Sequence, residues 1–365
     1  MVREQNILVY TGPGSSNSWI WLADFLEKHG FLNARFCPNP NEMMSPIRGS
    51  IAVIPGGDTF RIAESFGEEG LQELKRSIEG GSGYIGICAG AYLPLRSSIA
   101  PLSSFNLLDA TIANISSNLP KGNRDLEKYF VRYGCSYVFH PARGPLRLTG
   151  DRELIAPIYG GPILMPSDGV ETRLSFAGLA DDTEMIVERN LCERTLKGRA
   201  ALIEGRYGKG RVLSIAPHLE HPDYPPANDY LTHLLKGFES SKEFERKEPG
   251  DTTDIKEFRR VIADLRVLSN ALDTRSWKVG IKYWEGEKLL FFIDAVRKRM
   301  QKLAEAKKEP LEIPSDALNA FQESLSLLKE SKERDIDENT IDRVVINLSK
   351  GTSLFLNSYF SRKEK

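Results

Sequence analysis

The order of short apolar runs, glycine-rich turns and helical segments in the N-terminal part of the chain most limits the possible folds. Apolar runs of strand length lie at residues 7–10, 51–54 and 83–87, and each is followed by a turn that contains glycine. Residues 19–29 and 68–79 have the apolar spacing of helices and end at glycines. Strands that alternate with helices predict an α/β fold, in which a parallel sheet is flanked by helices.

Glycine-rich turns follow the three predicted strands, at residues 11–15, 56–57 and 88–90. The carboxyl ends of parallel strands meet at one edge of a sheet, and open α/β sheets bind their ligands there. A functional site is therefore expected at these turns. Further along, residues 200–206 and 211–215 predict a hairpin around the turn 207–210.

The composition of the sequence changes near residue 245, which we take as the end of the α/β domain, 1–245. Polar and charged residues and the pair Pro249-Gly250 predict a linker at 246–254. Beyond it, apolar residues recur at helical spacing and predict a helical bundle, 255–365, with a packed core. The stripes contain Phe258, Val261, Ile262, Leu265 and Leu268, then Leu289, Leu290, Ile293, Val296 and Met300, then Leu318, Phe321, Leu325 and Leu328, and finally Ile341, Val344, Val345, Leu348, Leu354 and Leu356.

Composition argues against several classes of protein. The 365 residues carry 49 Lys and Arg against 50 Asp and Glu, so an overall basic charge for nucleic acid is lacking. The four cysteines are scattered without a CxxC pair, which disfavours a disulfide framework and a zinc ribbon. Apolar runs are far shorter than the roughly 20 residues of a membrane span, and a secretory signal is not visible. We expect a cytoplasmic protein with no cofactor, no metal, no nucleic acid and no membrane partner.

The strongest local signal is the segment GICAGAY, in which Cys88 lies between Gly86 and Gly90. A G-x-C-x-G turn between a strand and a helix is the cysteine form of a nucleophile elbow. The sharp turn needs small neighbours, and the N–H groups of a helix that follows Cys88 would favour its thiolate. The N–H of Ala89 would then be one donor of an oxyanion hole.

A second oxyanion donor has to come from the loop of a neighbouring strand. The segment PGGD at residues 55–58 is suited, because glycine lets the backbone approach a developing oxyanion closely. Gly57 is the first candidate and Gly56 the second.

His218 and Glu220 offer a base and a group that orients it, as a cysteine nucleophile requires. They follow the apolar run 211–215 and are two residues apart, so in an extended segment both side chains point the same way. A metal site that includes His221 has less support, because a second cluster of ligands at metal spacing is lacking. A Gly-Cys-Gly turn alone is more often a tight connection. Its occurrence together with the Gly-Gly loop and the His-x-Glu segment is what favours a catalytic triad.

These segments resemble the class I glutamine amidotransferase-like superfamily. The superfamily resemblance is based on IPGGD, GICAGAY and SIAPHLE, and it covers about residues 5–235. Within the superfamily, VYTGPGSS, GICAGAY and YGGP are most similar to the biotin-protein ligase N-terminal-domain-like group. The resemblance implies a flavodoxin-like parallel sheet flanked by helices. It also implies a triad of Cys88, His218 and Glu220, in which the thiolate attacks a side-chain amide or a similar carbonyl.

The segments outside the triad predict contacts to a small-molecule amide substrate. Backbone N–H groups at the start of a helix bind a carboxylate or phosphate, although a plain turn explains residues 11–15 equally well. The segment 159–161 is placed at the pocket by the resemblance alone. The substrate-binding candidates are Gly12, Gly14, Ser15, Tyr92, Tyr159, Gly160 and Gly161.

Two features depart from the superfamily pattern. Leu219 replaces the usual proline of His-Pro-Glu, which leaves the charged pair intact. Ala91-Tyr92 replaces the Gly or His followed by Gln that helps glutaminases hold glutamine, so glutamine itself is in doubt as the substrate. The sequence contains neither a GRGRxGR-type biotinyl-adenylate loop nor a GxxxxGK[ST] phosphate loop.

Three functions are compatible with these residues. The first is an amidotransferase-like cysteine hydrolase that attacks a glutamine-type amide. The alternative is a catalytically inactive ligand-binding or regulatory module, whose helical domain binds a protein partner or mediates self-association. The third is another cysteine-elbow enzyme, such as a deglycase or peptidase of the same broad fold. Because all three triad residues are retained, an enzyme is favoured.

Overall fold

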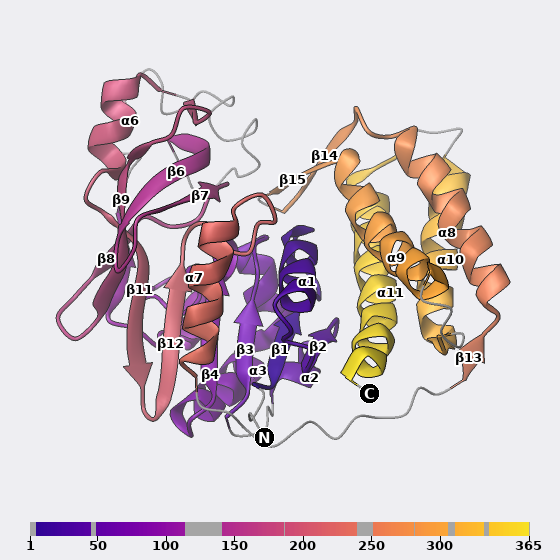
Figure 1. Cartoon of the computed structure of the whole chain (residues 1–365), viewed down its shortest axis with the longest axis horizontal. Coiled ribbons are helices and arrows are strands. Elements are labelled where there is room, and N and C mark those ends of the chain that lie inside the picture. Colours follow the sequence, from indigo (N-terminus) through magenta and orange to yellow (C-terminus); the bar gives the residue numbers. More distant parts are fainter. Residues whose placement is uncertain are drawn as a thin grey trace.

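The computed structural model describes residues 5–44, 49–113, 141–185, 187–238, 251–280, 282–305, 311–331 and 336–364. An α/β part holds the sheet, and a helical part, from α8 (Ile255–Asn270) to α11 (Glu338–Glu364), stands beside it (Figure 1). This confirms the predicted fold class. The predicted linker lies outside the described residues as far as Gly250, and the domain boundaries at 245 and 254 stay a prediction.

One large sheet runs through the α/β part, and its first half is parallel. The order is β2-β1-β3-β4-β12, and neighbouring strands in this set run parallel to one another. These strands are β2 (Ala34–Cys37), β1 (Ile7–Tyr10), β3 (Ile51–Ile54), β4 (Gly83–Ile87) and β12 (Gly210–Ile215).

The second half of the sheet is antiparallel and begins with the predicted hairpin. β11 (Ala200–Tyr207) pairs with β12, and Tyr207 lies opposite Gly210. The sheet continues through β9 (Glu171–Leu179), β6 (Ala142–Gly150) and β10 (Glu184–Met185), with β5 (Ala110–Ile112), β7 (Leu154–Ile158) and β8 (Leu164–Pro166) on side branches. A purely parallel sheet is therefore correct only for the first half.

Successive side chains of a parallel strand point to opposite faces of the sheet, and both faces are buried, which explains why strands such as β1 are apolar throughout. Ile7 and Val9 belong to the core beneath α1 (Ser18–Lys28) and α7 (Pro225–Lys236). Leu8 and Tyr10 belong to the core beneath α3 (Thr59–Glu79) on the other face. Because both faces are covered, β1, β3 and β4 bury every residue, which is typical of parallel sheets.

Helix α3 is longer than the sequence predicted. It begins at Thr59 rather than near residue 68, and the Asp58 side chain caps it by accepting hydrogen bonds from the N–H groups of Phe60 and Arg61. Gly67, with a φ of 65°, interrupts the helix, which is why the apolar periodicity revealed only its second half. The short helices among the described residues are α2 (Asn41–Met44), α6 (Arg189–Leu196) and the 3₁₀ turns Cys88–Ala91 and Leu102–Ser104.

Four helices after residue 254 confirm the predicted apolar stripes: α8 (Ile255–Asn270), α9 (Glu287–Glu305), α10 (Ser315–Glu330) and α11 (Glu338–Glu364). Two small strand pairs were not predicted. β13 (Thr252–Thr253) pairs with β16 (Ile313–Pro314), and β14 (Ser276–Val279) pairs with β15 (Lys282–Glu285). The second pair places Trp277 opposite Trp284, an alternation that the helical stripes around it concealed.

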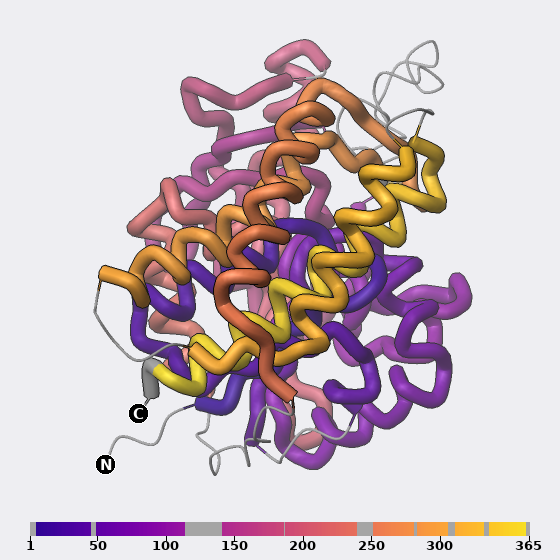
Figure 2. Tube along the Cα trace, turned by 90° about the vertical axis from the view of Figure 1, so that its right-hand side faces the viewer, coloured from indigo at the N-terminus to yellow at the C-terminus, as the bar shows by residue number. Residues whose placement is uncertain are grey.

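The helical part packs on the edge strand of the sheet, and its helices cross in front of the α/β part in Figure 2. The Asn357 side chain in α11 accepts a hydrogen bond from the Phe36 N–H and donates one to the Phe36 carbonyl, at 2.8 and 2.9 Å. These bonds occupy backbone groups of β2 that an edge strand would otherwise expose. Arg299 of α9 is fully buried and lies 2.9 Å from both Asp24 and Glu27 of α1.

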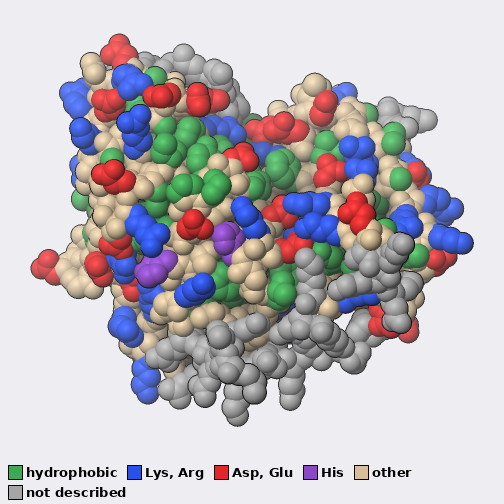
Figure 3. Space-filling model, viewed as in Figure 1, with side chains coloured by type: hydrophobic (Ala, Val, Ile, Leu, Met, Phe, Trp, Pro, Cys, Tyr) green, Lys and Arg blue, Asp and Glu red, His purple; other side chains and the backbone are tan. Residues whose placement is uncertain are grey.

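The surface carries both signs of charge. On the face drawn in Figure 3, acidic and basic side chains are interspersed, and hydrophobic side chains gather near the junction of the two parts. Within the described ranges, no helix combines the length and apolar character that a membrane crossing requires.

The close approach at Gly90 gives a test of this packing. A Cβ at Gly90 would overlap the carbonyl oxygen of Ile54, whereas a Cβ at Gly178 would meet no atom within 4 Å. We expect Gly90→Ala to lower the free energy of unfolding by about 1–3 kcal/mol, because overpacking forces the backbone to shift. Gly178→Ala is the control and should stay close to wild type in urea denaturation. Equal stability of the two variants would contradict the observed approach of the turn to β3.

Candidate active site

Strand register brings the predicted residues to one edge of the sheet. In the parallel pair β4–β12, Ile87 lies opposite Ile215, and both are the last residues of their strands. Cys88 therefore leaves the sheet beside the segment that leads to His218. The loops after β1 and β3 emerge at the same edge, because Val9 pairs with Val53.

Cys88 occupies a tight turn that few side chains adopt. Its φ is 53°, in the left-handed region, and the side chain is 8% exposed. A Cβ at Gly86 would overlap the carbonyl oxygen of Gly90, so glycine is required where the turn folds back. A non-glycine residue in this conformation is strained, and such strain is often found at functional sites.

The helix expected after Cys88 is not present. The structure has one 3₁₀ turn, Cys88–Ala91, followed by non-helical turns through Leu93 and Pro94. Pro94 disfavours helical backbone at the residue before it and lacks an N–H, which explains why the turn does not extend. The predicted support for a thiolate from a long helix dipole is therefore wrong. The donors that remain at the N-terminal end of this single turn, next to the Cys88 side chain, are its first backbone N–H groups, including that of Ala89.

His218 and Glu220 form a buried pair. The Nδ1 atom of His218 lies 2.7 Å from Oε1 of Glu220, and the two residues are 2% and 1% exposed. The N–H of His218 donates to the Pro157 carbonyl at 2.8 Å, which fixes the backbone that carries the ring. Since Nδ1 is engaged by Glu220, Nε2 is the nitrogen left for a neighbouring group.

Cys88 is that neighbour. A Cβ at Gly56 would lie 3.1 Å from Cε1 of His218 and 3.4 Å from Cβ of Cys88, so the two side chains meet over this glycine. Burial alone would lower the pKa of His218. The Glu220 carboxylate and the sulfur of Cys88, which is hydrogen-bonded to the ring, outweigh burial and raise the pKa to about 10. His218 is thus held as an imidazolium between two groups that stabilise its positive charge.

The predicted oxyanion loop is tightly constrained. The Ser16 N–H donates to the Gly56 carbonyl and the Asp58 N–H donates to the Gly14 carbonyl, both at 2.8 Å. Because these two bonds flank the pair of Ser15 and Gly57, the Gly57 N–H is directed away from Ser15. A Cβ at Gly57 would overlap the Gly14 carbonyl oxygen, and its φ of 153° also favours glycine.

The predicted substrate contacts fall into two groups. Tyr92 donates a hydrogen bond to the Gly160 carbonyl at 2.9 Å, and the Tyr159 ring lies 5.6 Å from the His218 ring. A Cβ at Gly161 would overlap the carbonyl oxygen of Ala216, so this loop packs directly on the segment that carries His218. These residues adjoin His218, the predicted base.

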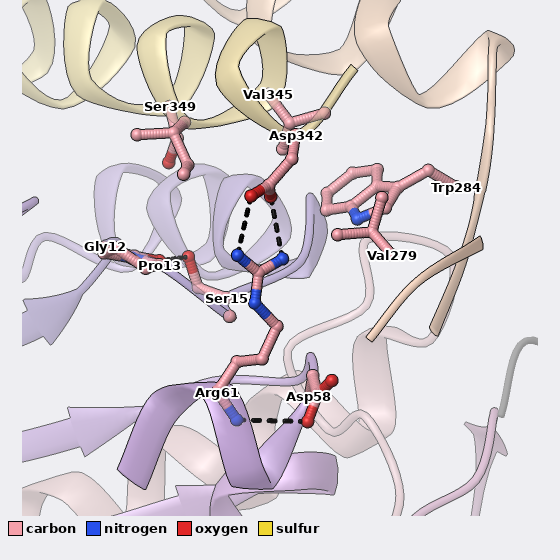
Figure 4. A pocket seen from close by; sticks show the side chains of 12 residues that line it. Gly12, Pro13, Ser15, Asp58, Arg61, Val279, Trp284, Asp342, Val345 and Ser349 are labelled. Atoms are coloured by element: carbon pink, nitrogen blue, oxygen red, sulfur yellow. Dashed lines mark hydrogen bonds and ion pairs between the residues drawn. The ribbon is translucent and has the colours of Figure 1, made fainter. Parts of the chain in front are cut away.

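Gly12, Gly14 and Ser15 line a different pocket, between the α/β part and the helical part. Arg61 crosses it and donates two hydrogen bonds to the Asp342 carboxylate, at 2.7 and 2.6 Å (Figure 4). The Ser15 N–H donates to the Gly12 carbonyl at 3.1 Å, and its hydroxyl donates to the same oxygen at 2.7 Å. This N–H is therefore engaged within the loop, as in a structural turn.

Sequence reasoning missed the aromatic side chains around His218. Trp21 in α1 meets the His218 ring edge-on at 5.3 Å and lies 4.4 Å from the His221 ring. Trp21 is only partly buried, whereas its neighbours Ile20 and Leu22 are in the core. A tryptophan off the buried stripe of a helix is the signal that could have indicated it. In the part of the chain with described coordinates, a cluster of His, Cys, Asp and Glu residues able to hold a metal ion is not found.

The raised pKa of His218 predicts a pH dependence of stability. A pKa of about 10 in the folded state lies above the roughly 6.5 of an unfolded histidine. Its stabilising contribution is therefore fully present below about pH 6.5 and is lost as the pH rises through about 10. We expect the free energy of unfolding, measured by urea denaturation, to change less between about pH 6.5 and about pH 10 in Glu220→Gln than in wild type. Glu323→Gln, at a half-exposed position, is the control. Identical slopes for wild type and Glu220→Gln would contradict this electrostatic coupling.

Comparison with protein families gives a match over the N-terminal segment that contains β1 to β4 and the Cys88 turn. Residues 5–98 match the family described as the N-terminal region of biotin-protein ligase. No curated protein matches the chain.

Several solved structures are similar at low identity. A glutamine amidotransferase is 16% identical, with a TM-score of 0.42, and the match covers 63% of this chain and 99% of that one. A Thermoplasma acidophilum protein proposed to belong to GMP synthase is 12% identical, with a TM-score of 0.37, and 64% and 94% of the two chains are covered. A β-galactosidase from Bacillus circulans is 12% identical, with a TM-score of 0.33, and the match covers 69% of this chain and 33% of that one. At these scores the solved structures add no evidence on function.

Residues 5–98, which include the Cys88 elbow, thus match the biotin-protein ligase N-terminal family, which confirms for this segment the resemblance to that group inferred from the sequence motifs.

Proposed function

We propose that this chain is a cysteine hydrolase of the amidotransferase-like class that cleaves the amide bond of a small molecule. The observation that supports this most is the meeting of Cys88, in its left-handed turn, with the buried pair of His218 and Glu220. A nucleophile, a base and a carboxylate that orients the base are the parts that such catalysis requires.

The proposed reaction begins with the Cys88 thiolate attacking the amide carbon. The N–H groups of Gly57 and Ala89, with Gly56 as the next candidate, hold the oxygen that becomes negative in the tetrahedral intermediate. When the C–N bond breaks, His218 gives its proton to the departing amine or ammonia, and a thioester remains on Cys88. Water then attacks the thioester and gives a proton to His218, and the acid leaves with the thiolate restored.

Glu220 has a positioning role in this proposal. Its carboxylate accepts a hydrogen bond from the protonated Nδ1 of His218 and keeps Nε2 directed at Cys88 and the leaving group. The pair is almost fully buried, which strengthens its electrostatic interaction over that of an exposed pair.

The chain contains its own controls for a test of the nucleophile. Burial raises the pKa of the thiols of Cys37 and Cys192, the latter to about 12, so both should alkylate slowly at neutral pH. We expect Cys88 to react fastest with iodoacetamide, followed site by site with mass spectrometry over a range of pH. His218→Ala should slow the reaction of Cys88 at pH 7 and leave Cys37 and Cys192 unchanged. Reaction of Cys88 at the rate of the buried cysteines would remove the activated nucleophile, and the alternative of an inactive ligand-binding module would then lead.

Turnover gives the second test. Once a screen of small amides identifies a substrate, Cys88→Ala should lower kcat by at least about a hundredfold, the usual range for loss of a catalytic group. Cys37→Ala is the matched control and should retain activity. Hydrolysis that survives in Cys88→Ala would contradict the proposal.

A further inference from the structure

We infer that Trp21, Tyr159 and His221 form a recognition surface for a neutral, planar aromatic group of the substrate, which Phe291 of the helical part extends. This surface is called the aromatic wall below. The inference rests on the proposed function in one respect only, namely that the bound group belongs to the molecule whose amide meets Cys88.

Three separate segments bring the aromatic wall to the base. Trp21 comes from α1, Tyr159 from the loop after β7, and His221 from the segment after β12. The rings of Trp21 and Tyr159 lie 5.3 and 5.6 Å from the His218 ring, and Trp21 lies 4.4 Å from His221. A group bound to these rings would therefore lie next to the reacting atoms.

Burial separates the aromatic wall from the reactive pair beneath it. His218 and Glu220 are almost completely enclosed, whereas Trp21, Tyr159, His221 and Phe291 are only partly buried. Partly exposed rings gathered beside His218 provide apolar area that a ligand can cover. Rings that served only to fill the core would be enclosed, as Trp19 and Phe292 on the same two helices are.

The spacing of the rings determines how a ligand can bind. The centroids of Trp21 and Tyr159 are 6.0 Å apart and the rings are tilted by 43°. A third ring between two stacked rings needs a separation of about 7 Å, twice the contact distance of carbon atoms. The ligand therefore packs against the outer faces or edges of these rings rather than inside a cage.

Charge at the aromatic wall selects a neutral group over a cation. The Arg143 guanidinium already lies over the Tyr159 ring, 5.4 Å from its centroid. His218 carries a positive charge at neutral pH, and burial together with this charge lowers the pKa of His221, which stays uncharged. The charge of His218 is balanced by Glu220, but Arg143 already occupies the face of the Tyr159 ring on which a substrate ammonium group would bind. The aromatic surface therefore suits a planar ring without positive charge better than the charged main chain of free glutamine.

The helical part contributes to this surface through Phe291 of α9. Its ring meets the Trp21 ring at 6.2 Å and 74°. The buried ion pairs of Arg299 with Asp24 and Glu27 join α9 to α1 farther along the same two helices. The helical part is thus anchored to the helix that carries Trp21, and it places one ring at the wall.

The test uses Cys88→Ala, which binds but does not turn over, and two amides that differ in one property. Phenylacetamide has a planar ring, and cyclohexylacetamide has a saturated ring of similar size. We expect Cys88→Ala to bind phenylacetamide at least about fivefold more tightly than cyclohexylacetamide, measured by isothermal titration calorimetry. Adding Trp21→Leu should bring the ratio of the two dissociation constants close to one. Adding Trp21→Phe instead should preserve most of the preference for phenylacetamide. Phe291→Leu should lower the ratio partially.

Tyr207→Leu is the matched control. Tyr207 is also a partly buried ring, but it lies in the β11–β12 hairpin beneath Lys75 and should leave the ratio unchanged. Thermal unfolding of each variant separates lost binding from lost folding, and Trp21→Phe keeps a ring in place should Trp21→Leu fail to fold. Equal binding of the two amides, binding of neither, or a ratio that Trp21→Leu and Trp21→Phe both leave unchanged would overturn the inference.

The same experiment separates this inference from the proposed function. If Cys88→Ala prefers the planar amide but wild type cleaves no amide, the aromatic wall stands and the hydrolase does not. If wild type cleaves both amides with equal kcat/KM, the hydrolase stands and the aromatic wall does not.

Discussion

The parallel pairing of β4 with β12 is the interaction on which the candidate site depends. Cys88 and His218 are 130 positions apart in the sequence, and the pairing of Ile87 with Ile215 brings their segments to the same edge of the sheet. A shift of one residue in this register would turn each side chain of β12 to the opposite face. The register is fixed because residues of both strands alternate between two buried faces, and a slip would place side chains in the wrong core.

Glycines at the sheet edge allow backbones to approach as closely as this site requires. The positions of Gly56, Gly57, Gly86, Gly90 and Gly161 each face a backbone or side-chain atom where a Cβ would stand. The loops after β3 and β4 are packed against each other, and the loop after β7 is packed against the segment after β12. Groups held so closely need little rearrangement when charge develops, which is the condition for effective electrostatic stabilisation. Burying His218 and Glu220 is costly, and their mutual hydrogen bond and opposite charges offset that cost.

The helical part is joined to the α/β part by polar as well as apolar contacts. Asn357 satisfies the backbone of the edge strand, and the hydroxyl groups of Ser349 and Ser353 donate to Thr11, each at 2.7 Å. The ion pair of Arg61 with Asp342 joins the start of α3, next to the predicted oxyanion loop, to α11, and the Gly280 backbone packs against the Asp58 side chain. Movement of the helical part would therefore disturb the loops that carry the candidate site.

Local sequence determined the elements of this protein and the residue types of its site. Short apolar runs ending in glycine turns identified β1, β3 and β4, and helical spacing identified α8 to α11, because these patterns reflect burial on fixed periods. Gly-Ile-Cys-Ala-Gly and His-Leu-Glu identified the candidate site residues by their chemistry. Another feature depends on residues distant in the chain, namely the strand order of the antiparallel half of the sheet. Only the tertiary structure decided that Trp21 lies between His218 and Phe291 and that Gly12 and Ser15 line a pocket with α11. No local period records which surfaces meet when distant segments pack.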